Sequence, residues 1–310
     1  MFGMDDILEA RERIAPYVYI TPMLHLENLD ERLGCQVYVK AECMQRTNSF
    51  KIRGVLNKML TMSKEELARG VVTASSGNHG KSVAFAAQLL GAKATIVIPD
   101  DTPQVKVDSI RRLGAEVVVC KFAERNIIAG QMGQKHGYVL IHPYDDYQIM
   151  AGQGTVGLEV MEQLPDVDYV VVPVSGGGLI AGLSTAVRAK SEHTKVIGAE
   201  PAALCRYAES VKECQRVYMD EQQSIADELL TQQPGMRNLP LVTAYVSDFV
   251  GVSDEFIRKA MNLLLREGKI LAEPSSCIGI GAVLQGEIKV QKTDKVCFVL
   301  SGGNVTQPLL

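Results

Sequence analysis

Short apolar runs alternate along this chain with helix-like segments of about 10 to 15 residues. The runs at 71–75 (VVTAS), 95–99 (TIVIP) and 168–174 (DYVVVPV) are rich in β-branched residues, which is typical of strands. Strands that are apolar throughout are buried on both faces, and this burial is usual in parallel sheets covered by helices. The alternation therefore predicts an α/β fold with mainly parallel sheets flanked by helices.

The same patterns place the remaining elements along the chain. We expect further strands at 36–42, 116–120, 138–143, 195–200 and 295–302. We expect helices at the N-terminus, at 50–62, at about 79–90 before Gly91, in the segment that ends at Gly114, and up to about 136. The stretch 212–241 is polar and is predicted to be a surface connection.

Composition narrows the class of protein. The chain has 310 residues, which suggests two domains, and its 32 basic against 36 acidic side chains give a net charge of −4. A mildly acidic chain is a poor partner for nucleic acid or an anionic membrane. The chain has no apolar run of about 18 residues, and its acidic start differs from a signal peptide. Seven cysteines without a CxxC pair favour a reducing, cytoplasmic compartment.

Three small or glycine-rich loops follow predicted strands, at 75–80 (SSGNHG), 175–182 (SGGGLIAG) and 301–304 (SGGN). Ligands of α/β sheets bind beyond the carboxyl ends of the strands. Glycines allow close approach of the backbone, and the free N–H groups at a helix start favour a phosphate. The N–H groups of the first loop are suited to a carboxylate. The alternative is that these residues only form turns and helix caps.

Two of these features leave alternatives open when taken alone. Gly176, Gly178 and Gly182 nearly fit a dinucleotide fingerprint, and Glu200 ends the next strand at about the spacing of a ribose-binding acid. Lys51 opens a short helix, where a lysine is usually solvated. A nucleophilic lysine would need desolvation or a cationic neighbour such as Arg53.

Five motifs taken in order resemble the fold type II pyridoxal-phosphate enzymes, and most closely the serine/threonine dehydratases and serine racemases. They are NSFKIRG (48–54), SSGNHG, SGGGLIAG, EPSS (273–276) and SGGN, and HPYDD (142–146) and AGQGT (151–155) agree with them. The resemblance implies pyridoxal 5'-phosphate as cofactor, with the glycine loop holding one phosphate instead of a dinucleotide. It also implies a large domain of residues 1–69 and 146–310 and a small mobile domain of residues 70–145, whose closure would exclude water.

The resemblance assigns roles to individual residues. Lys51 would form the Schiff base and then take the α-proton of the substrate. The other residues around the cofactor would be Phe50 and Glu273 beside the ring, Asn78 at the ring hydroxyl, Ser301 at the pyridine nitrogen, and Gly176, Gly177, Gly178 and Leu179 at the phosphate. The loop that receives the substrate carboxylate would consist of Ser75, Ser76, Gly77, Asn78 and His79.

The function that follows from the resemblance is an ammonia-lyase. It would convert L-serine or L-threonine by β-elimination to pyruvate or 2-oxobutanoate and ammonia. A serine racemase is the nearest alternative, because Ser76 stands where racemases have a second base facing Lys51. Further alternatives are a hydroxyaspartate dehydratase, a β-replacement synthase and a non-catalytic amino-acid-binding protein.

The chain departs from the family pattern near its cation site. Racemase-like members bind a divalent ion through a glutamate and a carboxylate six positions later, and here Glu200 is followed by Arg206. Either the site is absent or Arg206 replaces the ion, so the divalent cation stays open. Glu228 stands where the family usually has glycine. A homodimer is expected by analogy, and no regulatory domain is expected because the chain ends soon after Gly303.

Overall fold

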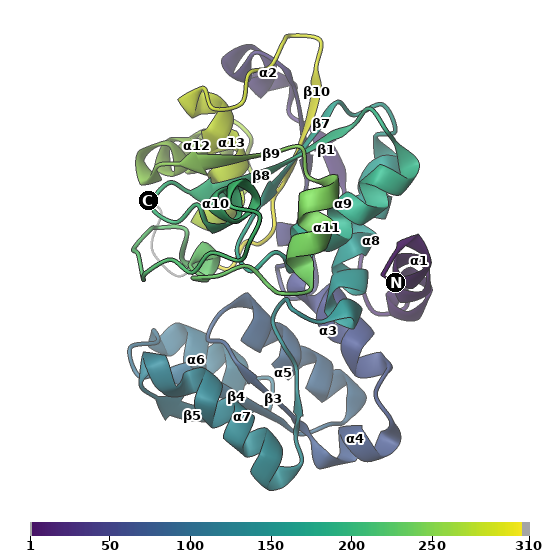
Figure 1. Cartoon of the computed structure of the whole chain (residues 1–310), viewed down its shortest axis with the longest axis vertical. Coiled ribbons are helices and arrows are strands. Elements are labelled where there is room, and N and C mark those ends of the chain that lie inside the picture. The colour runs from purple at the N-terminus through teal and green to yellow at the C-terminus, as the bar shows by residue number, and fades with distance from the viewer. Residues whose placement is uncertain (1, 306–310) are drawn as a thin grey trace.

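The computed structural model describes residues 2–305, which form two separate sheets (Figure 1). The six-stranded sheet runs in the order β1 (Met23–His25), β2 (Gln36–Lys40), β10 (Lys295–Val299), β7 (Tyr169–Pro173), β8 (Lys195–Pro201) and β9 (Asp248–Val252). The four-stranded sheet runs in the order β5 (Glu116–Cys120), β4 (Ala94–Pro99), β3 (Val71–Ala74) and β6 (Val139–Leu140). β1 pairs with β2 antiparallel and the other neighbours pair parallel, which confirms the predicted α/β fold class.

Helices cover the sheets and connect their strands. In the first half of the chain they are α1 (Met4–Ile14), α2 (Glu27–Leu33), α3 (Lys51–Leu60), α4 (Lys64–Arg69), α5 (Asn78–Leu90), α6 (Gln104–Arg111) and α7 (Arg125–His136). In the second half they are α8 (Tyr147–Gln163), α9 (Gly178–Lys190), α10 (Arg206–Lys212), α11 (Asn238–Tyr245), α12 (Asp254–Arg266) and α13 (Pro274–Gln285). Short 3-10 turns are η1 (Glu42–Met44), η2 (Phe122–Glu124) and η3 (Asp227–Leu229). Within residues 2–305, no helix has the length and apolar run needed to cross a bilayer.

The strand predicted at 138–143 is shorter than expected. Only Val139–Leu140 pairs with β3, because the chain turns at His142. The Nδ1 atom of His142 accepts the backbone N–H of Asp145 at 2.9 Å, and the side chain of Asp146 then caps α8. The turn replaces the last residues of the strand and leads the chain back to the larger sheet.

Helix α3 lies between the two lobes in Figure 1 and packs on α8 and on α5. Its apolar residues Ile52, Leu56 and Met59 are fully buried in the core that also holds Val71 and Ile96 of the four-stranded sheet. The strands of that sheet all fall within the range 70–145, although the domain boundaries themselves stay a prediction. Helix α3 thus contributes to the core beneath the small sheet although it precedes that range.

A buried ionic network fixes α3 against the larger sheet. The Arg53 guanidinium donates to Glu42 Oε2 at 2.8 Å and to Glu159 Oε1 at 2.6 Å. Lys40, on β2, donates to the other oxygen of Glu159 at 2.5 Å. Buried charges are tolerated only when they are paired and hydrogen-bonded. The network therefore ties α3 to η1, α8 and β2, two residues away from Lys51.

The variant Arg53→Met tests this network. It leaves Glu42 and one oxygen of Glu159 buried without a cation, so we expect the free energy of unfolding to fall by about 3–5 kcal/mol in urea titrations. The matched control is Arg11→Met, since the ion pair of Arg11 with Glu162 is exposed. It should lose less than about 1 kcal/mol. Equal losses in the two variants would contradict the role given to Arg53.

Candidate active site

Lys51 is the first residue of α3, which lies between the two lobes (Figure 1). Its Nζ atom donates to the carbonyl oxygen of Pro143 at 3.0 Å and lies 5.2 Å from the centre of the Phe50 ring. Phe50 donates its backbone N–H to the carbonyl of Ser301 at 3.0 Å. Burial lowers the pKa of Lys51 to about 8, against the opposing charges of Glu228 and Glu273. At a pKa of about 8, roughly a tenth of the Lys51 amines are uncharged at pH 7, far more than for an ordinary lysine.

The EPSS and SGGN motifs meet directly. The Ser276 and Ser301 hydroxyl oxygens are 3.0 Å apart, and Ser276 also accepts the backbone N–H of Gly302 at 2.7 Å. The Glu273 carboxyl lies against Gly302, where a Cβ atom would be 2.5 Å from Oε1. A side chain at position 302 would displace Glu273. The loop after β10 and the start of α13 thus form one hydrogen-bonded unit beside Phe50.

The SSGNHG loop joins this unit through Asn78. The Asn78 amide donates to Glu273 Oε1 at 2.9 Å and accepts from the Asn304 amide at 2.5 Å. Burial, followed by the charge of Glu228, raises the pKa of Glu273 to about 8. Ser75 and Ser76 follow β3 and are partly exposed. The loop is therefore attached through Asn78 to the start of α13 and to the SGGN loop.

His79 has a structural position within the same loop. Its Nε2 atom contacts the carbonyl oxygen of Ile141 at 2.9 Å, and the residue is 2% exposed. Burial, with the charge of Lys51, lowers its pKa to about 3. The imidazole is neutral at physiological pH. The predicted contact with a substrate carboxylate stays a prediction for this residue, which fastens α5 to the segment after β6.

The SGGGLIAG loop is shaped by two tyrosines. A Cβ atom on Gly176 would meet the Tyr144 ring at 2.3 Å, and one on Gly177 would lie 1.8 Å from the Tyr207 hydroxyl. Gly177 also has a φ of 95°, which favours glycine. Gly178 and Leu179 begin α9, and the N-cap Gly177 provides no side-chain cap. The first N–H groups of α9 are thus available to an anion.

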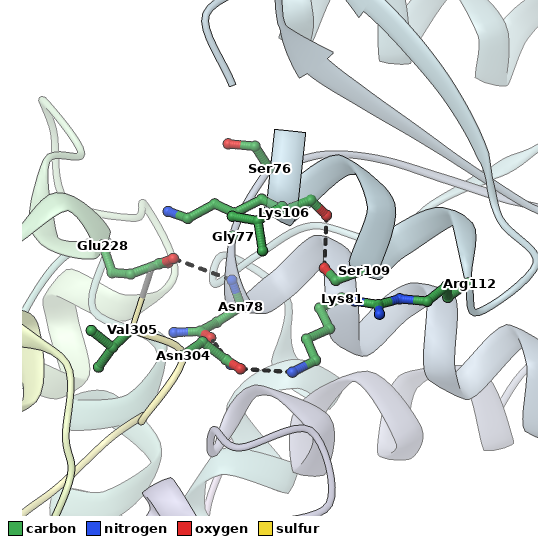
Figure 2. A pocket seen from close by; sticks show the side chains of 11 residues that line it. Ser76, Gly77, Asn78, Lys81, Lys106, Ser109, Arg112, Glu228, Asn304 and Val305 are labelled. Atoms are coloured by element: carbon green, nitrogen blue, oxygen red, sulfur yellow. Dashed lines mark hydrogen bonds between the residues drawn. The ribbon is translucent and has the colours of Figure 1, made fainter. Parts of the chain in front are cut away.

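A cavity of about 190 Å³ opens beside the SSGNHG loop (Figure 2). It is lined by Ser76, Gly77, Asn78, Lys81, Val105, Lys106, Ser109, Arg112, Glu228, Asn304 and Val305. Residues of the SSGNHG loop and of α6 thus face Glu228 of η3 and the SGGN loop. Lys51 and the glycine loop are not among the residues that line this cavity.

Comparison with known proteins identifies the family. A family model described as pyridoxal-phosphate dependent enzyme matches residues 14–302. The chain belongs to this family. It is 41% identical over 301 residues to an L-threonine ammonia-lyase of Geobacter sulfurreducens, covering 96% of this chain and 75% of that protein. It is 39% identical over 303 residues to an L-threo-3-hydroxyaspartate ammonia-lyase of Saccharomyces cerevisiae, covering 97% and 92%.

The fold of a solved relative agrees with that assignment. The structure of maize serine racemase superposes with a TM-score of 0.94 at 36% sequence identity, covering 98% of this chain and 94% of that one. The resemblance inferred from the five motifs is thereby confirmed. The family depends on pyridoxal phosphate, and the residues present fit that group. The buried amine of Lys51 suits its aldehyde, and the uncapped start of α9 suits its phosphate.

The dinucleotide alternative does not fit this pyridoxal-phosphate-dependent enzyme. Glu200 is fully buried, and its carboxylate accepts the backbone N–H groups of Tyr207 at 3.0 Å and Ala208 at 3.0 Å. These contacts place the carboxylate at the start of α10. A ribose would have to displace them. Glu200 therefore accepts the free N–H groups at the start of α10.

Arg206 lies beside Glu200, where members of the family with a cation site bind the ion according to the resemblance. Its guanidinium donates to the carbonyl oxygens of Val174 at 2.6 Å and Leu204 at 2.7 Å, and it lies 3.7 Å from Glu200 Oε1. Both side chains are fully buried. In residues 2–305, no cluster of three or more His, Cys, Asp or Glu side chains could hold a metal. The Arg206 guanidinium thus occupies the space beside Glu200 and holds the strand end that precedes the glycine loop.

The structure adds residues that sequence reasoning did not single out. Tyr144 and Tyr207 enclose the glycine loop, and the amide of Asn238 donates to the Gly176 carbonyl at 2.7 Å. Ser276 and Asn304 fall inside quoted motifs, so motif membership was a usable signal for them. Tyr207 and Asn238 lie within or beside polar stretches, and no sequence pattern marks them.

The titration of Lys51 gives a direct test of the site. Because burial lowers its pKa to about 8, the amine should become reactive as the pH rises through that value. In the apoprotein, trace acetylation with acetic anhydride followed by peptide mass analysis should give a midpoint near pH 8 for Lys51. Lys212, which is exposed, is acetylated in the same samples as a control. A Lys51 profile that rises in parallel with Lys212 would refute the desolvated amine.

Proposed function

We propose that this enzyme is an ammonia-lyase that converts L-threonine or L-serine to the corresponding 2-oxo acid and ammonia. The observation that carries the proposal is the buried Lys51 amine, which lies beside the linked EPSS, SGGN and SSGNHG motifs. The ammonia-lyase names of the relatives in Geobacter and Saccharomyces support it.

The residues of the site divide the reaction between them. Gly176 to Leu179 would hold the cofactor phosphate, and Phe50 and Asn78 would orient the ring. The bound cofactor supplies an electron sink for the pair left when the α-proton departs. Lys51 accepts that proton at Nζ, for which a pKa of about 8 is well matched near neutral pH. The β-hydroxyl would then leave as water with the proton that Lys51 accepted, and water would hydrolyse the released enamine to the oxo acid and ammonia.

Ser301 favours β-elimination over reactions that need a long-lived negative charge in the cofactor ring. Its hydroxyl would face the pyridine nitrogen, and a hydroxyl, unlike a carboxylate, does not hold a proton there. Less charge is then drawn into the ring, so rapid loss of a β-leaving group is favoured. The contact with Ser276 at 3.0 Å keeps the Ser301 hydroxyl oriented.

Racemisation is a second candidate function, which the position of Ser76 favours. Ser76 lines the cavity and lies on the loop after β3, whereas Lys51 lies on α3. A second acid–base group for racemisation would need to approach the substrate from the side opposite Lys51. The maize structure is a serine racemase, and the rest of the site is compatible with both reactions. We infer that elimination predominates and that racemisation is a side activity.

Assembly, domain motion and compartment are further proposals. We infer a homodimer, closure of the segment 70–145 over a small hydroxy amino acid, and a cytoplasmic location. The seven cysteines are all free thiols, and a reducing compartment suits them. Size-exclusion chromatography with light scattering tests the dimer.

The variant Lys51→Ala tests the proposed reaction. Without a base at this position, we expect formation of oxo acid to fall by about 10²–10⁴-fold or more. The holoenzyme is assayed with L-serine, D-serine, L-threonine and threo-3-hydroxyaspartate for ammonia and by chiral chromatography. The wild type should release ammonia fastest from L-threonine or L-serine. Borohydride reduction and peptide mapping should place a pyridoxyl group on Lys51.

The variant Ser76→Ala separates the two candidate functions. It should abolish interconversion of L- and D-serine while ammonia release from L-serine persists. Equal loss of both activities would contradict separate roles for Ser76 and Lys51. A wild-type protein that releases no ammonia and binds amino acids equally well after Lys51→Ala would favour a non-catalytic binding protein.

Replacement of a metal by Arg206 predicts independence from divalent ions. Treatment of the holoenzyme with EDTA should leave the rate within about twofold, because the guanidinium cannot be chelated. Arg206→Met should weaken cofactor binding by about tenfold or more, since the carbonyls behind the glycine loop lose a charged donor. Cofactor affinity is measured by absorbance titration. A rate restored only by added Mg²⁺ would contradict the proposal.

A further inference from the structure

The Glu228 carboxyl reaches from η3 onto the SSGNHG loop, where nothing in the proposed reaction uses it (Figure 2). Its Oε1 atom accepts the backbone N–H of Asn78 at 3.2 Å. The backbone N–H of Glu228 is itself held by the Ser275 hydroxyl at 3.2 Å. The carboxyl is thus anchored on the large domain and contacts the first turn of α5.

Gly77 makes this contact possible. A Cβ atom at position 77 would lie 1.9 Å from Glu228 Oε1 and 3.0 Å from Oε2. Both oxygens therefore lie directly over the backbone of the loop. The N-cap Gly77 offers no side-chain cap to α5, so the Asn78 N–H takes its acceptor from Glu228.

The groups around Glu228 are mixed in charge. Asp227 precedes it and pairs with Lys106 of α6 at 3.0 Å. The charges of Lys51, on α3, and of Glu273, at the start of α13, also reach the Glu228 carboxyl, and its burial raises its pKa. Lys106, Lys81 and Arg112 line the same cavity, so an incoming anion is attracted to it. The attraction draws a substrate carboxylate toward a loop on which a carboxyl group already lies.

We propose that Glu228 is a tethered carboxylate that occupies the carboxylate-binding position of residues 75–79 and competes with the α-carboxylate of the substrate. The inference rests on the proposed function, in which that loop receives the amino acid. A backbone N–H group that already donates to one carboxylate is not free for another, and two adjacent carboxylates repel each other at low dielectric. Glu228 must leave the loop before substrate can bind, and it thereby sets the KM.

The competition has a defined consequence for affinity. A ligand whose binding-competent state is only partly populated binds more weakly by that fraction. Removing the tethered carboxylate should raise affinity for every α-amino acid, whatever its side chain. A purely structural cap on α5 would have no such effect, and a catalytic acid would lower kcat when removed.

Two variants of the holoenzyme test the proposal. Glu228→Gln keeps the shape of the side chain and removes its charge, and Glu228→Gly removes the side chain. We expect Glu228→Gly to lower the KM for L-threonine or L-serine by about tenfold, with a smaller change in kcat. Glu228→Gln keeps an oxygen acceptor for the Asn78 N–H and should lower the KM by less. Glu209→Gln is the matched control, because Glu209 pairs with Lys212 on the surface and should leave KM unchanged.

A binding measurement without turnover completes the test. Glycine has no β-leaving group, so its dissociation constant is measured by calorimetry on the same proteins. It should fall by about tenfold in Glu228→Gly and by less in Glu228→Gln. An unchanged dissociation constant and KM, or a KM that rises, would overturn the proposal. Wild-type protein that yields no oxo acid would defeat the proposed function alone, since glycine affinity still reports on Glu228.

Discussion

The buried guanidinium of Arg53 fixes the part of the structure on which the site depends. It joins Glu42 before α3 to Glu159 on α8, and Lys40 completes the charge balance. All three partners lie outside α3, so the helix cannot rotate or slide without breaking a buried ion pair. Lys51 lies two residues earlier, on the first turn. The direction of its amine is therefore determined by electrostatics in the core, away from the reacting atoms.

Close packing on α8 links this helix to the cofactor loop. A Cβ atom on Gly152 would lie 2.5 Å from the carbonyl of Arg53, and one on Gly182 would lie 2.2 Å from the carbonyl of Met150. Helices α3 and α9 therefore both approach the backbone of α8 closely. A side chain at Gly152 or Gly182 would prevent this approach. The first turn of α3 carries Lys51, and that of α9 carries the glycines proposed to hold the cofactor phosphate. Helix α8 therefore sets the distance between Lys51 and the first turn of α9.

The sequence predicts those parts of the fold whose signal is local. Continuous apolar runs identify β4 and β7, and Gly91, with a φ of 67°, ends α5 as its position suggests. The strand after Tyr138 is shorter than predicted because the Nδ1 atom of His142 accepts backbone N–H groups and turns the chain. Helix α13 and strand β9 were not singled out. Helix α13 is buried along most of its length, so it lacks the polar face that marks an amphipathic helix.

Sequence reasoning about the site has a different limit. Motifs identify Lys51, Asn78 and Ser301 individually, but they do not show that Asn78 is bonded to Glu273. That contact spans 195 residues of sequence, and no periodicity or composition reports it. The same holds for the ends of the polar stretch 212–241, where the backbone of Gly235 donates to the carbonyl of Gly176. A segment that composition marks as a connection thus covers the glycine loop.

Arg206 places a fixed positive charge beside a buried carboxylate at the strand end that precedes the glycine loop. The carbonyls of Val174 and Leu204 point their negative ends at one position, and Glu200 adds a carboxylate there. The guanidinium satisfies these acceptors at the strand end that leads into the glycine loop. A metal ion must be captured from solution, and its occupancy varies with its concentration. A guanidinium attached to α10 is always present, so the geometry of the loop becomes a property of the chain alone.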